Sequence, residues 1–430
     1  AGRTTRWRID PYADEASRYG VLRGLLDQSP LAGGRQFSDA VAGPLLATLK
    51  EAGLRGMGGA GFPTQAKWEM VRARTEEPKA IIVNADESEP GTFKDRVILH
   101  ELPHLVVEGA IIAARVTGAR RGIIYIRHEY EPERRTLAAE IDRARASGLL
   151  PASTGGHGTP DGDAAGFDLE IFVSPGGYIL GEETALLEAL EDRRGEPRNK
   201  PPFPVSHGLH GKPTVINNVE TLAMVPAILS RGATWWREQG RDGCSGLKFI
   251  AVSGHVARPG VYEIESGTPI RELIETAGGV PGDRPVAAIA PGGASSPFLP
   301  PSSLEVGLDF AALQKAGSML GSGALVVVAE GTDLLDLATN VVAFFRNESC
   351  GKCVPCRTGS EKAVHILKDL LAGRGTQAAV NLLPELGETL RLTSICGLGQ
   401  VALNPILSVM KHFPELVPAR LGSPPPARPR

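Results

Sequence analysis

The sequence has no surplus of either charge and no long apolar run. Its 430 residues include 46 Lys and Arg against 49 Asp and Glu, a formal net charge of −3. This balance argues against general nucleic-acid binding and against an acidic solvating tail. The most apolar segments, residues 105–116 and 323–329, are short or are interrupted by Glu108, and neither reaches the ~18 apolar residues of a membrane span. We therefore expect any membrane contact to come through a partner protein.

Cysteine is scarce, and its distribution argues against a disulfide framework. Of the five cysteines, Cys350, Cys353, Cys356 and Cys396 fall late in the chain, and Cys244 stands alone. Three thiols separated by two residues each, with a distant fourth, are typical of all-cysteine 4Fe-4S ligation, and a tetrathiolate zinc site is the competing interpretation. We expect a reducing compartment, and a buried structural thiol at Cys244. The start of the sequence, AGRTTRWR, has no apolar signal-peptide core, so we expect a cytoplasmic location.

The first half of the sequence alternates between strand-like and helix-like segments. The length favours two or three domains at ~150 residues each. Apolar, β-rich runs at residues 80–84, 122–126 and 168–174 are separated by helical stretches at 102–117 and 133–147. This alternation predicts an α/β layer with a largely parallel sheet.

The pattern changes after residue 240. A hairpin over residues 247–264, a helix at 269–277 and a strand at 324–329 predict a small α+β module. From residue 332 the apolar periodicity becomes helical and predicts a bundle. Its expected helices are residues 334–345, 363–371, 382–392 and 405–413. We expect the last nine residues, 422–430, to be disordered, because they are rich in Pro and Arg.

A glycine-rich loop, GMGGAGFPT at residues 56–64, contains a formal G-x-G-x-x-G pattern. A dinucleotide fingerprint follows a strand, whereas residues 45–53 look helical, so this is a weak Rossmann match. The glycines still let the backbone approach a ligand, and a helix starting at Pro63, with Lys67 one turn in, offers N–H groups and a cation to a phosphate. A phosphate-binding loop and a plain glycine-rich turn both fit the pattern.

Four polar motifs occupy the ends of predicted elements. NADESEPG at residues 84–91 and GGYILGEET at 176–184 each follow a strand, where ligands bind in parallel sheets. A solvated acidic loop and ordinary helix N-terminal charges are the respective alternatives. RNKPPFP at 198–204 presents a cation and an aromatic ring on a proline run, and NNVET at 217–221 is typical of a helix cap.

Taken in this order, the motifs resemble the NADH-binding flavoprotein subunit of respiratory complex I and its relatives in soluble NAD-linked formate dehydrogenases and bidirectional hydrogenases. The resemblance spans about residues 45–413. It implies an α/β Rossmann-like FMN and NAD(H) domain over residues 1–240, a ubiquitin-like β-grasp (soluble-ligand-binding) module over 241–331 and a C-terminal four-helix bundle with a 4Fe-4S cluster over 332–421. It also implies iron–sulfur partner subunits, including a thioredoxin-like 2Fe-2S protein, and a location in the cytoplasm or at the cytoplasmic face of a membrane through the complex.

The resemblance further implies which residues bind the cofactors, with no catalytic side chain because FMN itself carries out hydride transfer. For FMN these are Gly56, Gly58, Gly59, Lys67, Asn84, Asp86, Glu87, Asn217, Asn218 and Thr221. For NAD(H) they are Phe62 and Phe203 on the adenine, with Glu89, Gly181, Glu182, Glu183 and Lys200. Glu183 matches the carboxylate that binds the adenosine ribose and repels a 2′-phosphate, which predicts NAD(H) over NADP(H). The cluster ligands are Cys350, Cys353, Cys356 and Cys396.

Three positions depart from the complex I pattern. Complex I members usually have arginine at the position of Met57, cysteine at Leu180 and an aromatic residue at Met70. These departures favour the beta subunit of a soluble NAD-dependent formate dehydrogenase, with complex I and an NAD-reducing hydrogenase as alternatives. The implied reaction is hydride transfer between NAD(H) and FMN, followed by single-electron transfer to the cluster. The alternative to an enzyme is a non-catalytic scaffold protein in which the four cysteines bind zinc.

Overall fold

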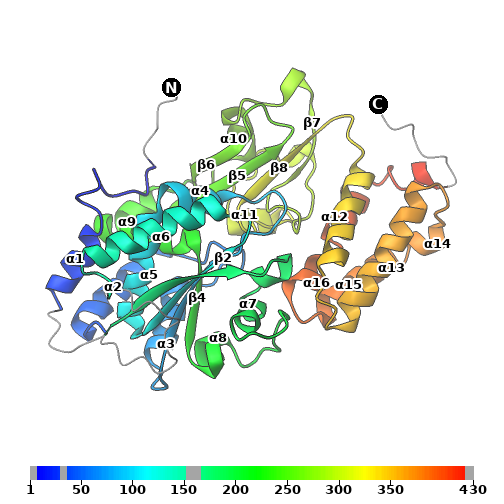
Figure 1. The fold of residues 1–430 in the computed structure, drawn as a ribbon. Coiled ribbons are helices and arrows are strands. Elements are labelled where there is room, and N and C mark those ends of the chain that lie inside the picture. The colour runs from blue at the N-terminus through cyan, green and yellow to red at the C-terminus, as the bar shows by residue number, and fades with distance from the viewer. Residues whose placement is uncertain (1–6, 30–35, 152–165, 422–430) are drawn as a thin grey trace.

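The computed structural model describes residues 7–29, 36–151 and 166–421. Along the chain it contains a first sheet covered by helices, a second sheet and a group of helices near the carboxyl end (Figure 1). The tail predicted to be disordered, residues 422–430, lies outside the described residues.

The first sheet is fully parallel and has the strand order β3-β2-β1-β4. Its strands are β1 (Ala80–Ala85), β2 (Arg121–Arg127), β3 (Asp168–Ser174) and β4 (Thr214–Asn218). The first three strands correspond to the predicted runs, and the prediction of an α/β fold with a parallel sheet is confirmed. Strand β4 was not predicted, because only Val215 and Ile216 give it an apolar centre between polar residues.

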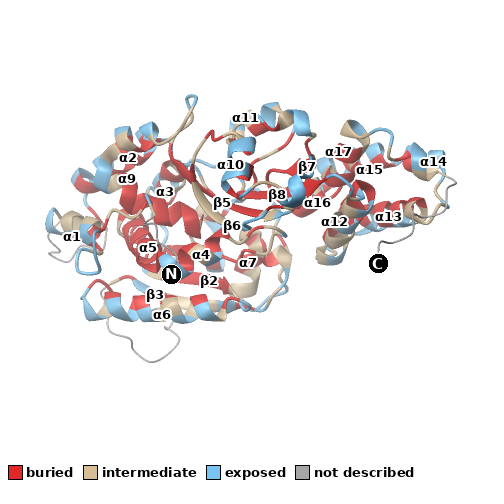
Figure 2. Cartoon of the chain, turned by 90° about the horizontal axis from the view of Figure 1, so that it is seen from above, coloured by how far each residue is buried: buried red, intermediate tan, exposed pale blue. Residues whose placement is uncertain are grey.

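Helices cover both faces of this sheet. Successive strand residues point to opposite faces, so that Ile81 joins the large core under α5 (Pro103–Thr117), whereas Ile82 joins a separate core on the other face. Helix α5 is buried along most of its length (Figure 2). It packs closely against α9 (Val219–Glu238), because a Cβ atom at Gly109 would lie only 2.2 Å from an α9 carbonyl oxygen.

Seven further helices surround the first sheet. They are α1 (Gly20–Asp27), α2 (Asp39–Ala52), α3 (Thr64–Arg72), α4 (Lys94–Glu101), α6 (Glu131–Ala146), α7 (Glu183–Leu190) and α8 (Pro204–His207). No single helix among the described residues is both long enough and apolar enough to cross a membrane. Helices α4 and α5 pass that test only as a pair, and they meet at an angle of 92°.

The second sheet is mixed and has the order β6-β5-β8-β7. Its strands are β5 (Leu247–Gly254), β6 (Gly260–Glu265), β7 (Val286–Ala290) and β8 (Ala324–Ala329), and its helices are α10 (Ile270–Thr276) and α11 (Phe310–Lys315). The central pair, β5 and β8, is parallel, and the outer pairs are antiparallel. The predicted hairpin is β5 and β6, while β7 was not predicted.

The carboxyl-terminal helices share one core with part of the second sheet. They are α12 (Leu334–Glu348), α13 (Val354–Leu371), α14 (Gln377–Val380), α15 (Leu383–Thr393), α16 (Gly397–Val401) and α17 (Asn404–His412). The four longer helices overlap the four predicted ones. Helix α13 begins earlier than expected, because Cys353 occupies its N-cap and the cysteine turn leads directly into it.

Candidate functional site

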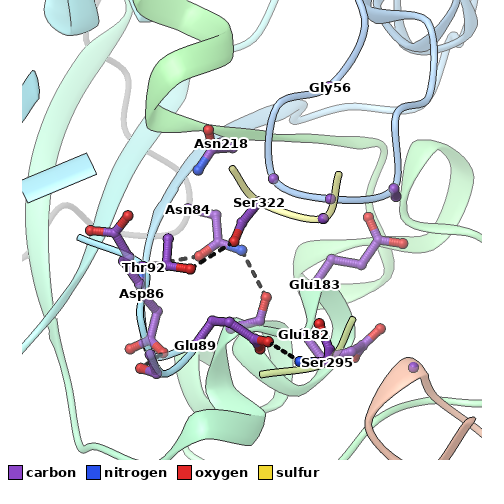
Figure 3. A pocket seen from close by; sticks show the side chains of 18 of the residues that line it. Gly56, Asn84, Asp86, Glu89, Thr92, Glu182, Glu183, Asn218, Ser295 and Ser322 are labelled. Atoms are coloured by element: carbon purple, nitrogen blue, oxygen red, sulfur yellow. Dashed lines mark hydrogen bonds between the residues drawn. The ribbon is translucent and has the colours of Figure 1, made fainter. Parts of the chain in front are cut away.

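A cavity of about 450 Å³ opens at the carboxyl ends of β1 and β4 (Figure 3), where parallel sheets bind their ligands. All three parts of the chain line this cavity. The predicted residues that line it are Gly56, Gly58, Gly59, Phe62, Lys67, Asn84, Asp86, Glu87, Glu89, Gly181, Glu182, Glu183, Lys200, Asn217 and Asn218. The second-sheet region contributes Ser295, Met319, Gly321 and Ser322, and the carboxyl-terminal helices contribute Gly397, Leu398 and Val401.

Two of the residues predicted to bind FMN or NAD(H) do not line this cavity. Thr221 is fully buried, and its hydroxyl accepts a hydrogen bond from the backbone N–H of Met57 at 2.9 Å. It therefore holds the glycine-rich loop in place from behind. Phe203 is 53% exposed on the surface just before α8.

The glycine-rich loop forms one wall of the cavity. The backbone N–H of Gly56 donates to the carbonyl of Phe62 at 2.8 Å, which closes the loop on itself. A Cβ atom at Gly58 would lie 3.1 Å from the Cβ atom of Asn218, and Gly59 has a φ of +115°, which L side chains rarely adopt. The glycines therefore bring bare backbone close to the polar residues at the end of β4.

Lys67 reaches into the same wall from the first turn of α3. Its Nζ donates to the carbonyl of Ile216 at 2.9 Å and lies 3.9 Å from Glu183. Burial lowers the pKa of Lys67, and the nearby carboxylate of Glu183 opposes that shift. A buried ammonium held in this way can offset the charge of an anionic ligand.

Asn84 and Asp86 stand at the end of β1. The Asn84 side chain donates to the carbonyl of Gly181 at 2.9 Å, which joins β1 to the loop before α7. Asp86 accepts a hydrogen bond from Ser88 at 2.9 Å. Burial raises the pKa of Asp86, and the neighbouring hydroxyls of Ser88 and Ser174 oppose that shift. The cavity wall therefore contains a buried carboxylate at this position.

Glu87 has a different role, because its carboxylate accepts hydrogen bonds from other residues of the protein. It accepts the backbone N–H groups of Asp95 at 2.9 Å and Arg96 at 3.1 Å, and the hydroxyl of Tyr130 at 2.9 Å. Burial raises the pKa of Glu87. The carboxylate caps the amino end of α4 and fixes the acidic loop against it.

Glu182 and Glu183 have different roles at the start of α7. One oxygen of Glu182 caps the helix, accepting the N–H groups of Thr184 and Ala185 at 2.9 Å each. Glu183 does not cap the helix, and its carboxylate faces the cavity (Figure 3), where Lys200 lies 2.7 Å away. The acidic partners raise the pKa of Lys200 against the effect of burial. The helix N-terminal charge considered from the sequence is thus Glu182, whereas the carboxylate of Glu183 pairs with Lys200 beside the cavity.

A chain of buried charges connects the cavity to the second sheet, and sequence reasoning did not find it. Lys94 lies 2.7 Å from Asp95 and 2.9 Å from Glu220, and Glu220 lies 2.5 Å from Lys248 of β5. Burial lowers the pKa of Lys248 to about 8. Asp95 accepts a hydrogen bond from Asn218 at 2.6 Å, so the chain ends at the cavity wall. Its partners are too distant in sequence to form a recognisable motif.

The four clustered cysteines surround a second, smaller cavity. It is lined by Ile179, Pro197, Cys350, Lys352, Cys353, Cys356, Ile395, Cys396 and Leu398. Among the described residues, no three His, Cys, Asp or Glu side chains are arranged to hold a single metal ion. Cys244 lies apart and is half-buried near Asp309, and not fully buried as expected.

Hydrogen-bond donors point at the cysteine sulfurs. Cys356 Sγ lies 3.2 Å from the hydroxyl of Ser349. Burial raises the pKa of Cys396, and the backbone N–H groups of Leu398 and Gly399 oppose that shift. Such donors are the usual surroundings of cluster-bound thiolates.

Two side chains, Ile179 and Leu398, line both cavities. The space at the end of the first sheet and the space among the cysteines therefore adjoin each other at these two side chains. Leu398 follows Cys396 by two residues, and Ile179 belongs to the GGYILGEET motif. The two predicted sites are therefore neighbours, with apolar side chains between them.

Comparison with known proteins gives three family matches along the chain. Residues 49–227 match the Nuo51 FMN-binding domain, residues 249–299 match the SLBB domain, and residues 336–420 match the NADH-ubiquinone oxidoreductase-F iron-sulfur binding region. These matches follow the same order as the first sheet, the second sheet and the carboxyl-terminal helices.

Individual relatives match nearly the whole chain. The second NADH-quinone oxidoreductase F subunit of Rhizobium meliloti (strain 1021) is 45% identical over 366 residues, which cover 85% of this chain and 86% of that protein. The NADH-quinone oxidoreductase F subunit of Streptomyces coelicolor is 42% identical over 410 residues, covering 95% and 87%. A crystal structure of an NAD⁺-reducing NiFe hydrogenase in the H₂-reduced state aligns with a TM-score of 0.80 at 38% identity, covering 94% of this chain and 67% of that chain.

An FMN-binding α/β domain followed by an iron–sulfur region defines an FMN and iron–sulfur oxidoreductase subunit. Its cofactors are FMN and a 4Fe-4S cluster, and its substrate is NAD(H). The chain belongs to the family of NADH-quinone oxidoreductase F subunits, of the 51-kDa type.

Proposed function

We propose that this chain exchanges a hydride between NAD(H) and FMN in the larger cavity and passes electrons singly to a 4Fe-4S cluster on Cys350, Cys353, Cys356 and Cys396. FMN supplies the two-electron to one-electron conversion that this sequence of steps needs. The observation that carries the proposal is the shared wall of Ile179 and Leu398, which puts the two sites next to each other. Short separation through packed apolar atoms suits electron transfer without access of water.

The residues present fit both groups. The larger cavity offers bare glycine backbone at Gly58 and Gly59 and the ammonium of Lys67. The smaller cavity offers four thiols and hydrogen-bond donors to sulfur. The residues that we assign to FMN are Gly56, Gly58, Gly59, Lys67, Asn84, Asp86, Asn217 and Asn218, with Glu87 and Thr221 as residues that hold the surrounding loops in place.

We assign the nicotinamide nucleotide to the open side of the same cavity. Phe62 lines the cavity and is 43% exposed, as a ring that stacks on an incoming adenine should be. Glu183 and Lys200 lie within reach of the ribose and phosphates, with Gly181, Glu182 and Glu89 near the cofactor. Phe203 would complete the adenine site by moving from the surface. The protein supplies position and charge, and no side chain acts as an acid or base.

The resemblance also supports finer descriptions of the three parts. We assign residues 1–240 to a Rossmann-like FMN and NAD(H) domain, 241–331 to a β-grasp module and 332–421 to a four-helix bundle. The order β6-β5-β8-β7, with a parallel central pair, supports the β-grasp assignment. Helices α12, α13, α15 and α17 support the bundle.

The parent complex is the most specific part of the proposal. The named relatives belong to NADH-quinone oxidoreductase, and the aligned structure is an NAD⁺-reducing hydrogenase. Met57, Leu180 and Met70 support the beta subunit of a soluble NAD-dependent formate dehydrogenase. Met57 and Leu180 are buried, whereas Met70 is 45% exposed. In each case the chain would work with iron–sulfur partner subunits, including a thioredoxin-like 2Fe-2S protein. The complex would lie in the cytoplasm or at the cytoplasmic face of a membrane.

The test is an absorption spectrum of the anaerobically purified protein before and after NADH, with iron and zinc measured on the same sample. We expect flavin bands that bleach on NADH addition and about four irons per chain. A colourless, zinc-containing protein would contradict the proposal and favour the scaffold. The complex purified with its partners should then be assayed for NAD⁺ reduction by formate and by H₂, and for quinone reduction by NADH. Each candidate parent complex predicts activity with a different pair of electron donor and acceptor.

A further inference from the structure

Ser349 lies between α12 and the first cysteine of the cluster motif, and its hydroxyl meets a cysteine sulfur. Its Oγ lies 3.2 Å from the Sγ of Cys356. The backbone N–H of Gly351 donates to the same Oγ at 3.3 Å. The hydroxyl is therefore bonded on two sides within the turn that carries Cys350 and Cys353.

These two contacts decide which group is the donor. A hydroxyl has one proton to give and two lone pairs that accept. The N–H of Gly351 can only donate, so it occupies a lone pair of Ser349. A cysteine bound to iron is a thiolate and has no proton of its own, so Cys356 can only accept. The proton of Ser349 is thus directed at the sulfur of Cys356.

Two other polar side chains near the cysteines bond backbone carbonyls instead. The hydroxyl of Ser360 donates to the backbone carbonyl of Cys356 at 2.6 Å, four residues earlier in the same helix. Lys352 donates to the carbonyl of Pro197 at 2.7 Å. Ser349 differs from both, because its hydroxyl bonds the sulfur of a cluster cysteine directly.

We propose that Ser349 is a positioning residue that raises the reduction potential of the 4Fe-4S cluster through a hydrogen bond to Cys356 Sγ. A cluster gains one negative charge when it accepts an electron, and a hydrogen bond to a ligating sulfur stabilises the more negative state more strongly. The reduced cluster therefore forms more readily, which favours electron flow from NADH. This inference rests on the proposed assignment of the four cysteines as cluster ligands.

The decisive experiment is a redox titration of the purified full-length holoprotein with dithionite, followed by electron paramagnetic resonance of the reduced cluster. Dithionite delivers the single electron directly, so the measurement does not depend on NADH or on turnover. Ser349→Ala should shift the equilibrium between reduced and oxidised cluster about tenfold toward the oxidised form, which is about 59 mV for one electron. Ser349→Thr keeps the hydroxyl and should restore the wild-type potential.

Ser360→Ala is the matched control, because the hydroxyl of Ser360 also bonds Cys356, but at its backbone carbonyl. It should leave the potential unchanged. The proposal is overturned if Ser349→Ala keeps about four irons and the wild-type potential, or if Ser360→Ala lowers the potential equally. It is also overturned if Ser349→Ala and Ser349→Gly both lose the cluster while Ser349→Thr keeps it, since the hydroxyl would then retain the cluster and not tune it. Absence of iron from the wild type would instead contradict the proposed function itself.

Discussion

Tyr178 donates its phenolic hydrogen to the carboxylate of Glu89 across 2.6 Å. The same tyrosine packs against Phe344 and Phe345 of α12, with ring centroids 5.1 and 5.9 Å away. Glu89 also accepts the backbone N–H of Ser295 from the second-sheet region at 2.7 Å (Figure 3). One carboxylate at the cavity thus connects all three parts of the chain. Tyr178 did not appear among the predicted site residues, although it lies within the GGYILGEET motif.

Replacing Tyr178 by phenylalanine should change the pH dependence of nucleotide binding. Burial raises the pKa of Glu89, and the hydrogen bonds from Tyr178 and Ser295 lower it. Loss of the bond from Tyr178 should raise that pKa further, because the bond stabilises the charged carboxylate. Glu89 lines the cavity, so an anionic dinucleotide should bind more tightly once Glu89 is protonated.

The measurement is the NADH dissociation constant as a function of pH, followed by flavin bleaching. In Tyr178→Phe the tightening on acidification should begin at a higher pH than in the wild type. Tyr262→Phe is the control, because its hydroxyl bonds only the carbonyl of Arg258 at the surface. Superimposable profiles for wild type and Tyr178→Phe would contradict the coupling.

Glu183→Ala should relax discrimination against NADPH. Glu183 faces the cavity, and a carboxylate there repels a 2′-phosphate, so its removal should improve the NADPH to NADH ratio of kcat/KM about tenfold or more. Glu188→Gln is a control on the same helix, because Glu188 pairs with Arg198 and does not line the cavity. An unchanged ratio in Glu183→Ala, or an equal change in both variants, would refute the assignment.

Glu220→Gln should destabilise the protein by about 3–5 kcal/mol, because it leaves the buried charges of Lys94 and Lys248 without their shared partner. The readout is the denaturant midpoint. Glu51→Gln provides the comparison, since Glu51 pairs with Arg237 at the surface at 2.9 Å and its removal should cost less than about 1 kcal/mol. Equal midpoints for the two variants would show that the buried chain of charges does not stabilise the fold.

Glu108 should make stability fall as pH rises. Burial raises the pKa of Glu108 to about 7 from its ordinary value of 4.5, although Tyr12 and the N–H of Leu22 donate hydrogen bonds to it. Between these pH values Glu108 keeps a proton in the folded chain that it has released in the unfolded chain, so this residue should contribute a loss of about 3 kcal/mol in the free energy of unfolding from pH 4.5 to pH 7.

Glu108→Gln should lack this loss. The free energy of unfolding of both proteins, measured across that pH window, tests the prediction. Parallel curves would mean that Glu108 titrates near its ordinary pKa in the folded protein.

The parts of the site that could be predicted from the sequence are those formed by residues close together in the chain. The spacing of Cys350, Cys353 and Cys356 places three thiols within one turn at the start of α13, and a distant Cys396 could complete a set of four. The glycine loop and the motifs after β1 and before α7 were likewise recognisable, because backbone conformation and strand ends are local properties. All the predicted cofactor residues except Phe203 and Thr221 line the cavity.

The remaining features depend on partners far apart in the chain. Glu108 looked like an interruption of an apolar run, but in the structure it is a buried acceptor for Tyr12, 96 residues away. Lys94 and Lys248 gain their role only through Glu220, and Thr221 only through Met57. Strand β4 gave a weak signal because its polar end serves the cavity and its apolar centre is short. Such features become visible only when the sheet has brought distant segments together.

Because the wall of the cavity includes Gly397, Leu398 and Val401, the order of biosynthesis constrains assembly. The nascent chain can form the first sheet early, yet the pocket remains open on one side until the last helices leave the ribosome. Full enclosure of the flavin must therefore follow translation of the carboxyl-terminal region, and fragments lacking that region would hold the flavin in an open, solvent-accessible pocket.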